Sequence, residues 1–346
     1  MKILHVLNSV LFSGAENVAC QIIQHFNNNI DCQMAYCSPY SADVEKALQE
    51  RGIKYYPVPS LSVRHLKGIV KRFKPDIIHS HDMKASFVSS FIKQNNRLIF
   101  HIHNNAFDSR RVSFKSIAFS FAAKKADHIF WVSKSSFEGF RFHERVKNKS
   151  EILYNIIDVE SLYQRMHTDN ASYDFDVIYA GRITYQKDPL RMINIFSKLV
   201  EKKGDLRIAV VGCGDMEDEA RRMSSDLKLK SNVFFLGYMS NPLKIIHDSK
   251  ILIMTSRWEG TPMVALESMA LGTPIVTTPV DGLKDVIVNG DTGFMSDDDD
   301  ELVGAIIRLL EDERLLKLMR AKCIDESKKR NDSSWFYESI YNSYLS

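Results

Sequence analysis

Two carboxylates flank the start of a predicted helix in the second half of the chain. Glu259 and Gly260 follow an apolar strand predicted at Ile251–Met254, and Glu267 lies on the second turn of the helix that comes next. Carboxylates accept strong hydrogen bonds from the hydroxyls of a sugar or a ribose. This context of strand, glycine and helix favours a ligand site over the alternative, which is two solvated charges.

The same predicted helix offers backbone donors. Thr261 is a good N-cap residue and Pro262 suits the first helical position, so we expect the helix to begin there. The N–H groups of Met263 and Val264 would then bind an anion such as phosphate. Because ligands bind at the carboxyl ends of parallel strands, the pattern predicts a phosphate site at this edge of a sheet.

A second motif places two cations after another strand. Gly181 directly follows the predicted strand Asp176–Ala180, and Arg182 and Lys187 lie in the loop after it. Arg offers a planar fork of donors and Lys a point charge, a combination that neutralises a diphosphate. Two exposed loop cations are the alternative, and the glutamate motif further along the chain favours the diphosphate site.

Two glycine motifs carry weaker signals. Val210–Asp215 places a glycine turn after a strand, but Glu217 occupies the last position of a G-x-G-x-x-G fingerprint, which argues against NAD. Phe12–Glu16 follows the first strand, and its Gly14 would let the loop bend over a phosphate. Glu16 would stabilise the N-terminus of the next helix. Both residues also have a purely structural alternative.

Four histidines lie near strand ends. His79 and His81 flank the end of one predicted strand, and His101 and His103 flank the end of the next, so alternation puts each pair on one face. No clear set of carboxylate partners accompanies them, so we expect no metal site. His103 is the best candidate to donate a hydrogen bond to a sugar or phosphate, and His81 is a second candidate. A structural role is the alternative for each.

Short apolar strands alternate with helical stretches in both halves, which is typical of parallel α/β layers. The predicted strands are Lys2–Leu7, Cys32–Cys37, Ile77–His79, Arg97–His101 and His128–Val132, then Asp176–Ala180, Arg207–Val211, Val233–Leu236, Ile251–Met254 and Pro274–Thr277. Predicted helices include Ala15–Phe26, Asp43–Arg51 and Glu301–Leu310.

The length of 346 residues fits two domains. We place the joint in the polar stretch Val159–Tyr173, which shows no apolar periodicity, and expect domains at 1–165 and 166–333. Residues 334–346 are rich in aromatic side chains, which a solvated tail does not normally carry. We expect a helix there that packs either back on the first domain or on the core of the second.

The charge is spread unevenly. Residues 1–165 hold 23 Lys and Arg against 14 Asp and Glu, and the rest of the chain holds 23 against 29. This asymmetry suggests that only the first half meets a negatively charged surface. Val63–Lys74 and Arg110–Lys125 mix cations with apolar residues, as helices on anionic lipid do. Solvated helices with one buried face are the alternative. No groove-reading motif indicates nucleic acid.

The cysteines and the lengths of the apolar runs indicate the cellular compartment of the protein. Five cysteines without C-x-x-C spacing argue against a disulfide framework and fit a reducing cytoplasm. No run approaches the roughly 18 apolar residues that span a bilayer. We therefore expect a cytoplasmic protein, peripheral on the inner face of the cell membrane if the basic half binds lipid.

Taken together, the motifs resemble those of the retaining glycosyltransferases of family 4, which have the GT-B fold. The resemblance covers nearly the whole chain. Its segments, in the family's order, are FSGAE at 12–16, IIHSHD at 77–82, FHIHN at 100–104, WVSKSS at 131–136, LYNIID at 153–158, YAGRITYQKDP at 179–189, VVGCGD at 210–215, FLGY at 235–238 and EGTPMVALESMALGTPIV at 259–276. It implies two Rossmann-like domains with a cleft between them.

The resemblance also implies roles for residues in the second domain. Arg182 and Lys187 would bind the diphosphate of a nucleotide-sugar donor, Glu259 the hydroxyls of the donor sugar, and Glu267 the ribose. Gly237 and Tyr238 would lie near the nucleobase. In the first domain, which would bind the acceptor, Gly14 would approach the diphosphate and His103 would contact the donor sugar near the reacting carbon.

The chain departs from the common form of the family pattern at three places. Position 13 is Ser where a second Gly is frequent, and residues 261–262 are Thr-Pro where Phe-Gly is common, so one N–H is lost from the phosphate-binding turn. Residues 155–157 read Asn-Ile-Ile where Asn-Gly-Ile is usual, which predicts a less sharp turn.

The implied reaction moves a sugar, with retention, from a UDP-sugar to a saccharide acceptor that is lipid-linked, as in surface polysaccharide synthesis. It needs no metal or other cofactor, because Arg182, Lys187 and the helix N-terminus stabilise the leaving diphosphate and the nucleotide-sugar is a substrate. Two alternatives stay open: a sugar-nucleotide epimerase of the same fold, and an inactive module that binds a nucleotide-sugar.

Overall fold

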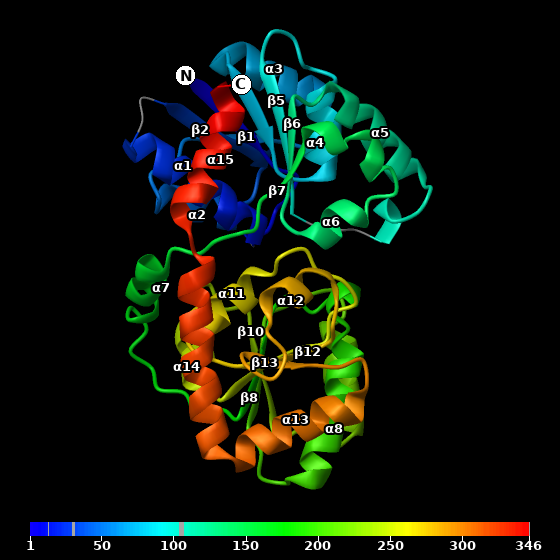
Figure 1. The fold of residues 1–346 in the computed structure, drawn as a ribbon, viewed down its shortest axis with the longest axis vertical. Coiled ribbons are helices and arrows are strands. Elements are labelled where there is room, and N and C mark those ends of the chain that lie inside the picture. The colour runs from blue at the N-terminus through cyan, green and yellow to red at the C-terminus, as the bar shows by residue number, and fades with distance from the viewer. Residues whose placement is uncertain (13, 30–31, 104–106, 346) are drawn as a thin grey trace. The chain divides into compact units, whose positions relative to one another are not determined.

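The structure is a computed structural model that describes residues 1–12, 14–29, 32–103 and 107–345 (Figure 1). Two compact units divide the chain. Unit 1 comprises Met1–Asn155 together with Ser333–Ser346, and unit 2 comprises Ile156–Asp332. Each unit is built on its own parallel sheet with helices between successive strands, as the alternation of apolar and helical segments predicts.

Unit 1 holds a sheet with the strand order β3-β2-β1-β4-β5-β6-β7. Its strands are β1 (Lys2–Val6), β2 (Gln33–Pro39), β3 (Tyr55–Val58), β4 (Ile77–Ser80), β5 (Arg97–Ile102), β6 (His128–Trp131) and β7 (Ser150–Ile152). Its helices are α1 (Gly14–Asn29), α2 (Ala42–Gln49), α3 (Val63–Phe73), α4 (Met83–Ser90), α5 (Phe114–Lys125), α6 (Lys134–Glu138) and α15 (Ser333–Leu345).

Side-chain caps fix where several of these helices begin. In α2 to α6 the N-cap side chain accepts a hydrogen bond from the backbone N–H of the third helical residue, which satisfies one donor that the helix itself leaves free. The capping residues are Ser41, Ser62, Asp82, Ser113 and Ser133. Each cap therefore ties the start of a helix to the loop that leaves the preceding strand.

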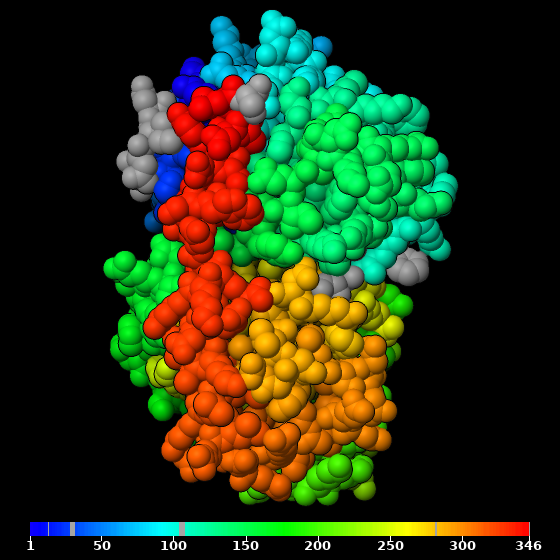
Figure 2. All heavy atoms as spheres, in the orientation of Figure 1, coloured from blue at the N-terminus to red at the C-terminus, as the bar shows by residue number. Residues whose placement is uncertain are grey.

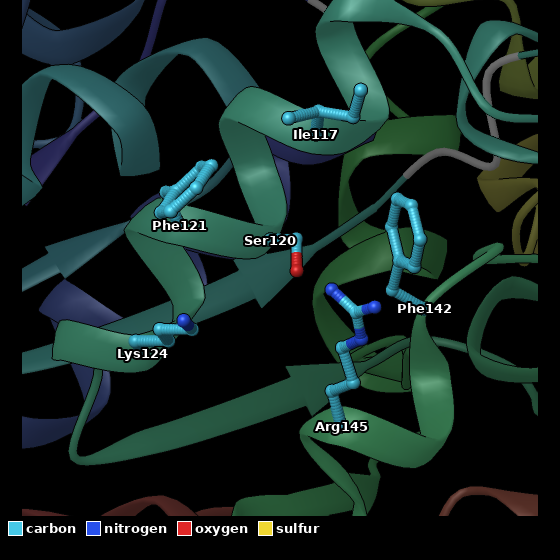
Figure 3. Close-up of a pocket in the computed structure, with 6 residues that line it drawn as sticks. All are labelled: Ile117, Ser120, Phe121, Lys124, Phe142 and Arg145. Atoms are coloured by element: carbon cyan, nitrogen blue, oxygen red, sulfur yellow. The ribbon is translucent and has the colours of Figure 1, made fainter.

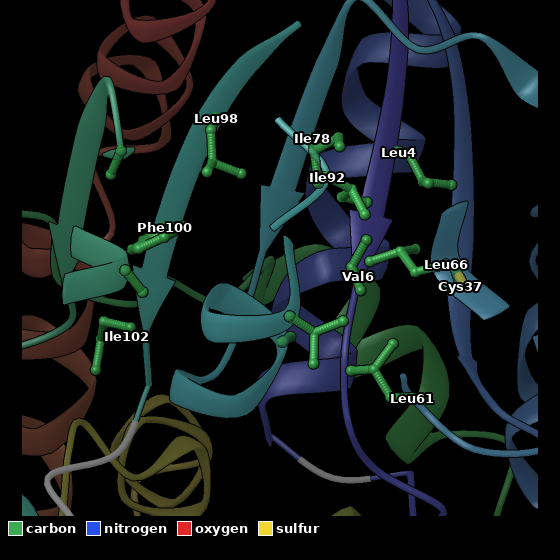
Figure 4. Packing of buried hydrophobic residues seen from close by; sticks show 14 of the residues in the cluster. Leu4, Val6, Cys37, Leu61, Leu66, Ile78, Ile92, Leu98, Phe100 and Ile102 are labelled. Atoms are coloured by element: carbon green, nitrogen blue, oxygen red, sulfur yellow. The ribbon is translucent and has the colours of Figure 1, made fainter. Parts of the chain in front are cut away.

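The two faces of the unit 1 sheet differ in chemistry. One face presents Leu4, Ile78, Leu98 and Phe100, all fully buried in an apolar cluster (Figure 4). The other face presents histidines, because His5 and His79 are register partners on β1 and β4 and the side-chain direction alternates along each strand. This alternation sets the histidine face of the sheet apart from its apolar core.

Unit 2 repeats the design with the strand order β10-β9-β8-β11-β12-β13. Its strands are β8 (Val177–Ala180), β9 (Ile208–Val211), β10 (Val233–Gly237), β11 (Ile251–Met254), β12 (Ile275–Thr277) and β13 (Gly293–Met295). Its helices are α7 (Val159–Met166), α8 (Pro189–Lys202), α9 (Glu217–Asp226), α10 (Leu243–Asp248), α11 (Met263–Ala270), α12 (Asp281–Val286), α13 (Asp299–Glu311) and α14 (Glu313–Arg330).

Three strands lie outside the sequence prediction. β3, β7 and β13 are short edge or near-edge strands of 4, 3 and 3 residues. Each lacks an apolar run: β3 contains Pro57, and β7 begins with Ser150 and Glu151. Their backbones are held by pairing with a neighbouring strand, which local composition does not reveal.

The predicted joint at Val159–Tyr173 is wrong for its first half, because α7 forms there. Leu162 and Met166 are buried on one side of this short helix. The side-chain hydroxyl of Tyr163 donates to the carbonyl of Ala270, and the carbonyl of Arg165 accepts a hydrogen bond from Asn241. α7 thus belongs to unit 2, and the boundary lies after Asn155 instead of after residue 165.

The aromatic helix α15 is part of unit 1, where Figure 2 shows it in red at the surface. Phe26 of α1 contacts the rings of Tyr337, Tyr341 and Tyr344, with centroids 5.8 to 6.2 Å apart. The hydroxyl of Tyr344 lies 2.8 Å from Nδ1 of His79. Of the two packing partners considered from sequence, the first domain is therefore the one on which the helix packs.

Within the described ranges, none of the helices combines the length and the apolar character that crossing a bilayer requires.

Candidate active site

The candidate site of unit 2 lies where the order of its sheet reverses. β8 and β11 are neighbours at the centre, and the chain leaves β8 towards β9 on one side and β11 towards β12 on the other. In open α/β sheets, ligands bind outside the carboxyl ends of the two strands at such a switch point. The loops that follow β8 and β11 carry both cation and carboxylate motifs predicted from sequence.

An ion pair joins these two loops. Nζ of Lys187 lies 2.5 Å from Oε1 of Glu259, and the hydroxyl of Ser256 donates to the same oxygen at 2.6 Å. The side chains of Lys187 and Glu259 are only 11% and 5% exposed. The structure therefore brings together two of the predicted site residues, and each of them holds the other in place.

Further contacts fix the backbone around this pair. The amide of Gln186 donates to the carbonyl of Trp258, and the backbone N–H of Arg257 donates to the carbonyl of Gln186. The Arg257 guanidinium pairs with Asp188 at 2.8 Å. Asp188 has a φ of 50°, a left-handed conformation that Asp tolerates better than most residues. These hydrogen bonds and this ion pair thus join the two loops.

Arg182 is exposed and makes no ion pair with any residue that the structure describes. Its backbone is nevertheless held, because the hydroxyl of buried Tyr179 donates to its carbonyl at 2.7 Å. Gly181 directly follows β8, and its N–H donates to the carbonyl of Val211. A guanidinium on a fixed backbone, with no protein anion attached, is suited to bind an oxyanion.

The glycine turn after β9 lies directly against the loop that follows β8. A Cβ at Gly212 would lie 1.9 Å from the carbonyl oxygen of Gly181, and one at Gly214 would lie 2.1 Å from that of Ile183. Gly212 also has a φ of 131°. Both glycines therefore allow the β8 and β9 loops to pack backbone against backbone.

Helix α11 begins one residue later than predicted. Pro262 is the N-cap and not the first helical residue, its conformation is extended, and no side chain caps the helix. Met263 and Val264 are the first two helical residues, so their N–H groups have no acceptor within the helix. Because a Cβ at Gly282 would lie 1.5 Å from the carbonyl oxygen of Gly260, the start of α12 packs directly on this turn.

Glu267 lies on the second turn of α11, as predicted, with its side chain 15% exposed. Burial raises the pKa of this carboxyl from 4.5 to about 7, and the guanidinium of Arg165, 3.7 Å from Oε1, acts in the opposite direction. A carboxylate that is desolvated and only weakly paired has its hydrogen-bonding capacity available to a hydroxyl ligand.

Gly237 is the last residue of β10, and Tyr238 directly follows it. Gly237 has a φ of 72°, and its carbonyl accepts a hydrogen bond from the N–H of Gly212. The Tyr238 side chain is 58% exposed. An exposed ring next to a left-handed glycine can stack on a planar ligand.

The predicted site residues of unit 1 lie at the carboxyl ends of β1, β4 and β5. Gly14 is the first residue of α1, and Glu16 lies in its first turn, as predicted. Nε2 of His103 lies 3.0 Å from Nδ1 of His81. Ser13 and Asn104, which the sequence motifs include, lie outside the described residues.

Several residues of the unit 2 site are not predicted from sequence. Ser256 holds Glu259, Gln186 holds the carbonyl of Trp258, and Tyr179 holds the carbonyl of Arg182. The Gln186 contact joins two loops that only the fold brings together. Ser256 and Tyr179 each lie three residues before the residue they hold, and this spacing is the local signal that could have identified them.

Comparisons with known families agree with this geometry. Residues 12–161 match the family described as Glycosyltransferase Family 4, and residues 164–330 match Glycosyl transferases group 1. This chain belongs to the family 4 glycosyltransferases. The two matches meet near the boundary between the units, so unit 1 and unit 2 of the glycosyltransferase each correspond to one family domain.

The glycosyltransferase is similar to two bacterial enzymes along most of its length. It is 25% identical to the N-acetylgalactosamine-N,N'-diacetylbacillosaminyl-diphospho-undecaprenol 4-alpha-N-acetylgalactosaminyltransferase of Campylobacter jejuni, over 89% of this chain and 88% of the other. It is 22% identical to the UDP-Gal:alpha-D-GlcNAc-diphosphoundecaprenol alpha-1,3-galactosyltransferase of Escherichia coli, over 93% and 91%.

Its fold matches that of Anabaena HepE in complex with UDP and glucose, with a TM-score of 0.87 over 100% of both chains at 18% identity. The fold is therefore GT-B, as the sequence predicts, and the glycosyltransferase is related to enzymes of polysaccharide biosynthesis.

Proposed function

We propose that this glycosyltransferase transfers a sugar from a UDP-sugar to a lipid-linked saccharide, with retention at the anomeric carbon, in the synthesis of a surface polysaccharide. The observation that carries the proposal is the Lys187–Glu259 pair beside the N-terminus of α11. The name of the Escherichia coli relative includes a UDP-sugar donor and a diphosphoundecaprenol acceptor, and HepE binds UDP and glucose. Both features support the same substrate classes for this chain.

The donor diphosphate would bind between the two cationic side chains and the start of α11. Exposed Arg182 supplies a fork of donors, and the N–H groups of Met263 and Val264 supply the positive end of a helix. Lys187 would share its proton donors between Glu259 and a phosphate oxygen, because an ammonium has three donors. These groups stabilise the charge that develops on the leaving diphosphate.

Glu259 and Glu267 would hold the two hydroxyl-bearing parts of the donor. Lys187 and Ser256 hold Glu259 in place through Oε1. The family resemblance assigns Glu259 to the hydroxyls of the transferred sugar. Glu267 lies further along α11 and would bind the ribose. The exposed ring of Tyr238 would stack on the nucleobase.

The proposed step breaks the bond between the anomeric carbon and the diphosphate oxygen and forms one to the acceptor oxygen. The acceptor arrives on the face that the diphosphate leaves, and a donor phosphate oxygen takes its proton, so the configuration is retained without an enzyme nucleophile. His103 would donate a hydrogen bond to the donor sugar. The charge stabilisation comes from protein cations, so this step requires no metal.

A membrane-bound acceptor also fits the surface of α5. Phe114, Ile117 and Phe121 follow one side of this helix with 86%, 41% and 63% of their areas exposed, and the same helix carries Lys115 and Lys124. An apolar stripe flanked by cations is suited to the surface of an anionic bilayer. The basic helix α3 differs, because its apolar residues Leu66 and Phe73 are buried in the core, as the solvated alternative predicts.

A pocket lies beside this stripe. It is lined by Ile117, Ser120, Phe121, Lys124, Phe142 and Arg145, which Figure 3 shows on α5 and on the neighbouring segment that carries Phe142 and Arg145. The Arg145 guanidinium lies 4.6 Å from the centre of the Phe142 ring. Cations next to aromatic surface would accommodate a lipid phosphate with its chain. We propose that α5 places the enzyme on the membrane that carries its acceptor.

The experiment that tests the proposal measures nucleoside diphosphate release from a panel of nucleotide-sugars, with and without a lipid-linked acceptor extract. Arg182→Ala and Glu259→Ala should each lower acceptor-dependent release by about 100-fold or more. Glu201→Ala, at an exposed position in unit 2, is the matched control and should not change it. The anomeric configuration of the product, read by NMR, tests retention.

The other outcomes separate the remaining functions. Interconversion of sugars without an acceptor would identify an epimerase, and tight donor binding without turnover would identify an inactive module. Membrane binding is tested by flotation with phosphatidylglycerol or phosphatidylcholine vesicles. Phe114→Ser with Phe121→Ser should abolish binding to the anionic vesicles, and Leu318→Ser, at an exposed apolar residue of unit 2, should not.

A further inference from the structure

Five histidines gather at the carboxyl end of the unit 1 sheet. His5 lies on β1, His79 on β4, His101 on β5, and His81 and His103 directly follow β4 and β5. The first four are 0% exposed. Their rings form a continuous array, with centroids 4.2 Å apart between His101 and His103 and 4.5 Å apart between His79 and His81. Strands β1, β4 and β5 are neighbours, so the fold concentrates imidazoles at one place.

The hydrogen bonds within this array leave many ring nitrogens unused. Nδ1 of His5 lies 2.9 Å from Nε2 of His81, and Nδ1 of His81 lies 3.0 Å from Nε2 of His103. Among the described residues, both ring nitrogens of His101 are buried without a partner, as are Nε2 of His5, Nε2 of His79 and Nδ1 of His103. Buried polar atoms without partners are costly, and so many at one place indicate a missing ligand.

The geometry of three of these residues suits a metal ion. His81, His101 and His103 each offer a ring nitrogen, and the three atoms lie within 4.8 Å of one another. In a tetrahedral zinc site with Zn–N bonds of about 2.0–2.1 Å, the ligand nitrogens are about 3.3 Å apart. The His81 and His103 nitrogens are 3.0 Å apart in a hydrogen bond, so an ion would replace this hydrogen bond and both rings would turn their nitrogens towards it.

Contrary to the expectation from sequence of no metal site, we propose that His81, His101 and His103 form a binding site for a divalent transition metal of the zinc class. The donors are imidazole nitrogens without a carboxylate, a set that selects zinc, cobalt, nickel or copper over magnesium or calcium. Three protein ligands leave one tetrahedral position for water or an anion. Because His103 is only partly buried, the ion can reach the site from that end of the array.

His5 is the positioning residue of this site. For His81 to bind the ion through Nδ1, its proton must reside on Nε2, where it donates to Nδ1 of His5 at 2.9 Å. His103 binds through Nε2 and keeps its proton on Nδ1. Such a partner behind a ligating histidine fixes the tautomer and the ring orientation. In the bound state His103 is therefore held as an Nδ1–H donor.

The second histidine group, His5, His79 and His81, is the less favourable site. All three side chains are fully buried, and Nδ1 of His79 already bonds to the Tyr344 hydroxyl. It also shares His81 with the proposed site. The proposal therefore assigns one ion per chain.

The test is a titration of the metal-stripped, full-length protein with Co²⁺, followed by visible absorption. We expect one Co²⁺ per chain, a tetrahedral d–d spectrum, displacement by Zn²⁺ and no displacement by Mg²⁺. His101→Phe, which keeps a ring in the array, should lower the Co²⁺ affinity more than about 10-fold. His103→Gln, at the partly exposed end of the array, should also lower the Co²⁺ affinity more than about 10-fold. This second variant tests the proposal if His101→Phe fails to fold.

The matched control is His167→Gln, at an exposed histidine of unit 2, which should leave the Co²⁺ affinity unchanged. The proposal is overturned if the wild type binds no Co²⁺, if the spectrum is octahedral, or if His101→Phe and His103→Gln bind as the wild type does. Absorption reports metal binding without any sugar transfer, so this result and the result on the proposed function are independent.

Discussion

The buried carboxyl of Glu267 makes the stability of unit 2 depend on pH. Its pKa is about 7 in the folded protein and 4.5 in the unfolded chain. The folded state therefore holds a proton that the unfolded state releases between these values, so this group's contribution to stability is complete below pH 4.5 and is lost as the pH rises through 7. From pH 5 to pH 8 the loss is about 2.5 kcal/mol, since one pKa unit corresponds to about 1.4 kcal/mol.

Glu267→Gln removes the titration and keeps the shape of the side chain. We expect the stability of this variant, relative to the wild type, to increase by about 2.5 kcal/mol between pH 5 and pH 8. Urea unfolding at pH 5, 6, 7 and 8 measures this difference, and its trend does not depend on the constant effect of losing the Arg165 contact. Glu201→Gln, at an exposed site, should show no trend.

The reasoning fails if the stability difference between Glu267→Gln and the wild type is the same at all four pH values, or if Glu201→Gln changes in parallel. A second variant tests the cause of the pKa. Arg165→Met removes the cation 3.7 Å from the carboxyl, so the pKa of Glu267 should rise further and the loss of stability should shift to higher pH.

Three other predictions concern packing and pairing. Lys187→Met leaves the Glu259 carboxylate buried without its cation and should cost about 3–5 kcal/mol, most of which Lys187→Met with Glu259→Gln should recover in a double-mutant cycle in urea. Gly212→Ala puts a methyl group 1.9 Å from a carbonyl oxygen of the β8 loop. The free energy of unfolding, measured by thermal denaturation, should therefore fall by more than about 2 kcal/mol. Tyr344→Phe removes a buried hydrogen bond and should cost about 1 kcal/mol, against no loss for Tyr341→Phe, in urea unfolding.

The architecture could be predicted from sequence because both sheets are parallel and buried. Continuous apolar runs bounded by polar or turn residues mark such strands, and Ile251–Met254 is an example that the structure reproduces. The site loops could be located for the same reason, since residues after a parallel strand lie at the ligand-binding edge. The same reasoning predicts Arg182, Lys187 and Glu259 as site residues.

Other features depend on contacts between distant segments. The glycines after β9 are needed because another backbone lies against them, and nothing in Val210–Asp215 identifies that neighbour. Helix α7 contains only Leu162 and Met166 as buried residues, too few for a visible period. The histidine array requires the register of three strands, because His5 lies more than 70 residues from His79 in the chain.

The helix α15 has a consequence for how the protein is made. Unit 1 contains residues from both sides of unit 2, so a ribosome completes the whole of unit 2 before it synthesises α15. During that interval Phe26 and His79 lack their tyrosine partners, and nascent unit 1 exposes aromatic surface that the finished enzyme buries. Chaperones that recognise exposed aromatic surface can bind nascent unit 1 during this interval. A chain terminated after residue 332 would expose the same surface permanently.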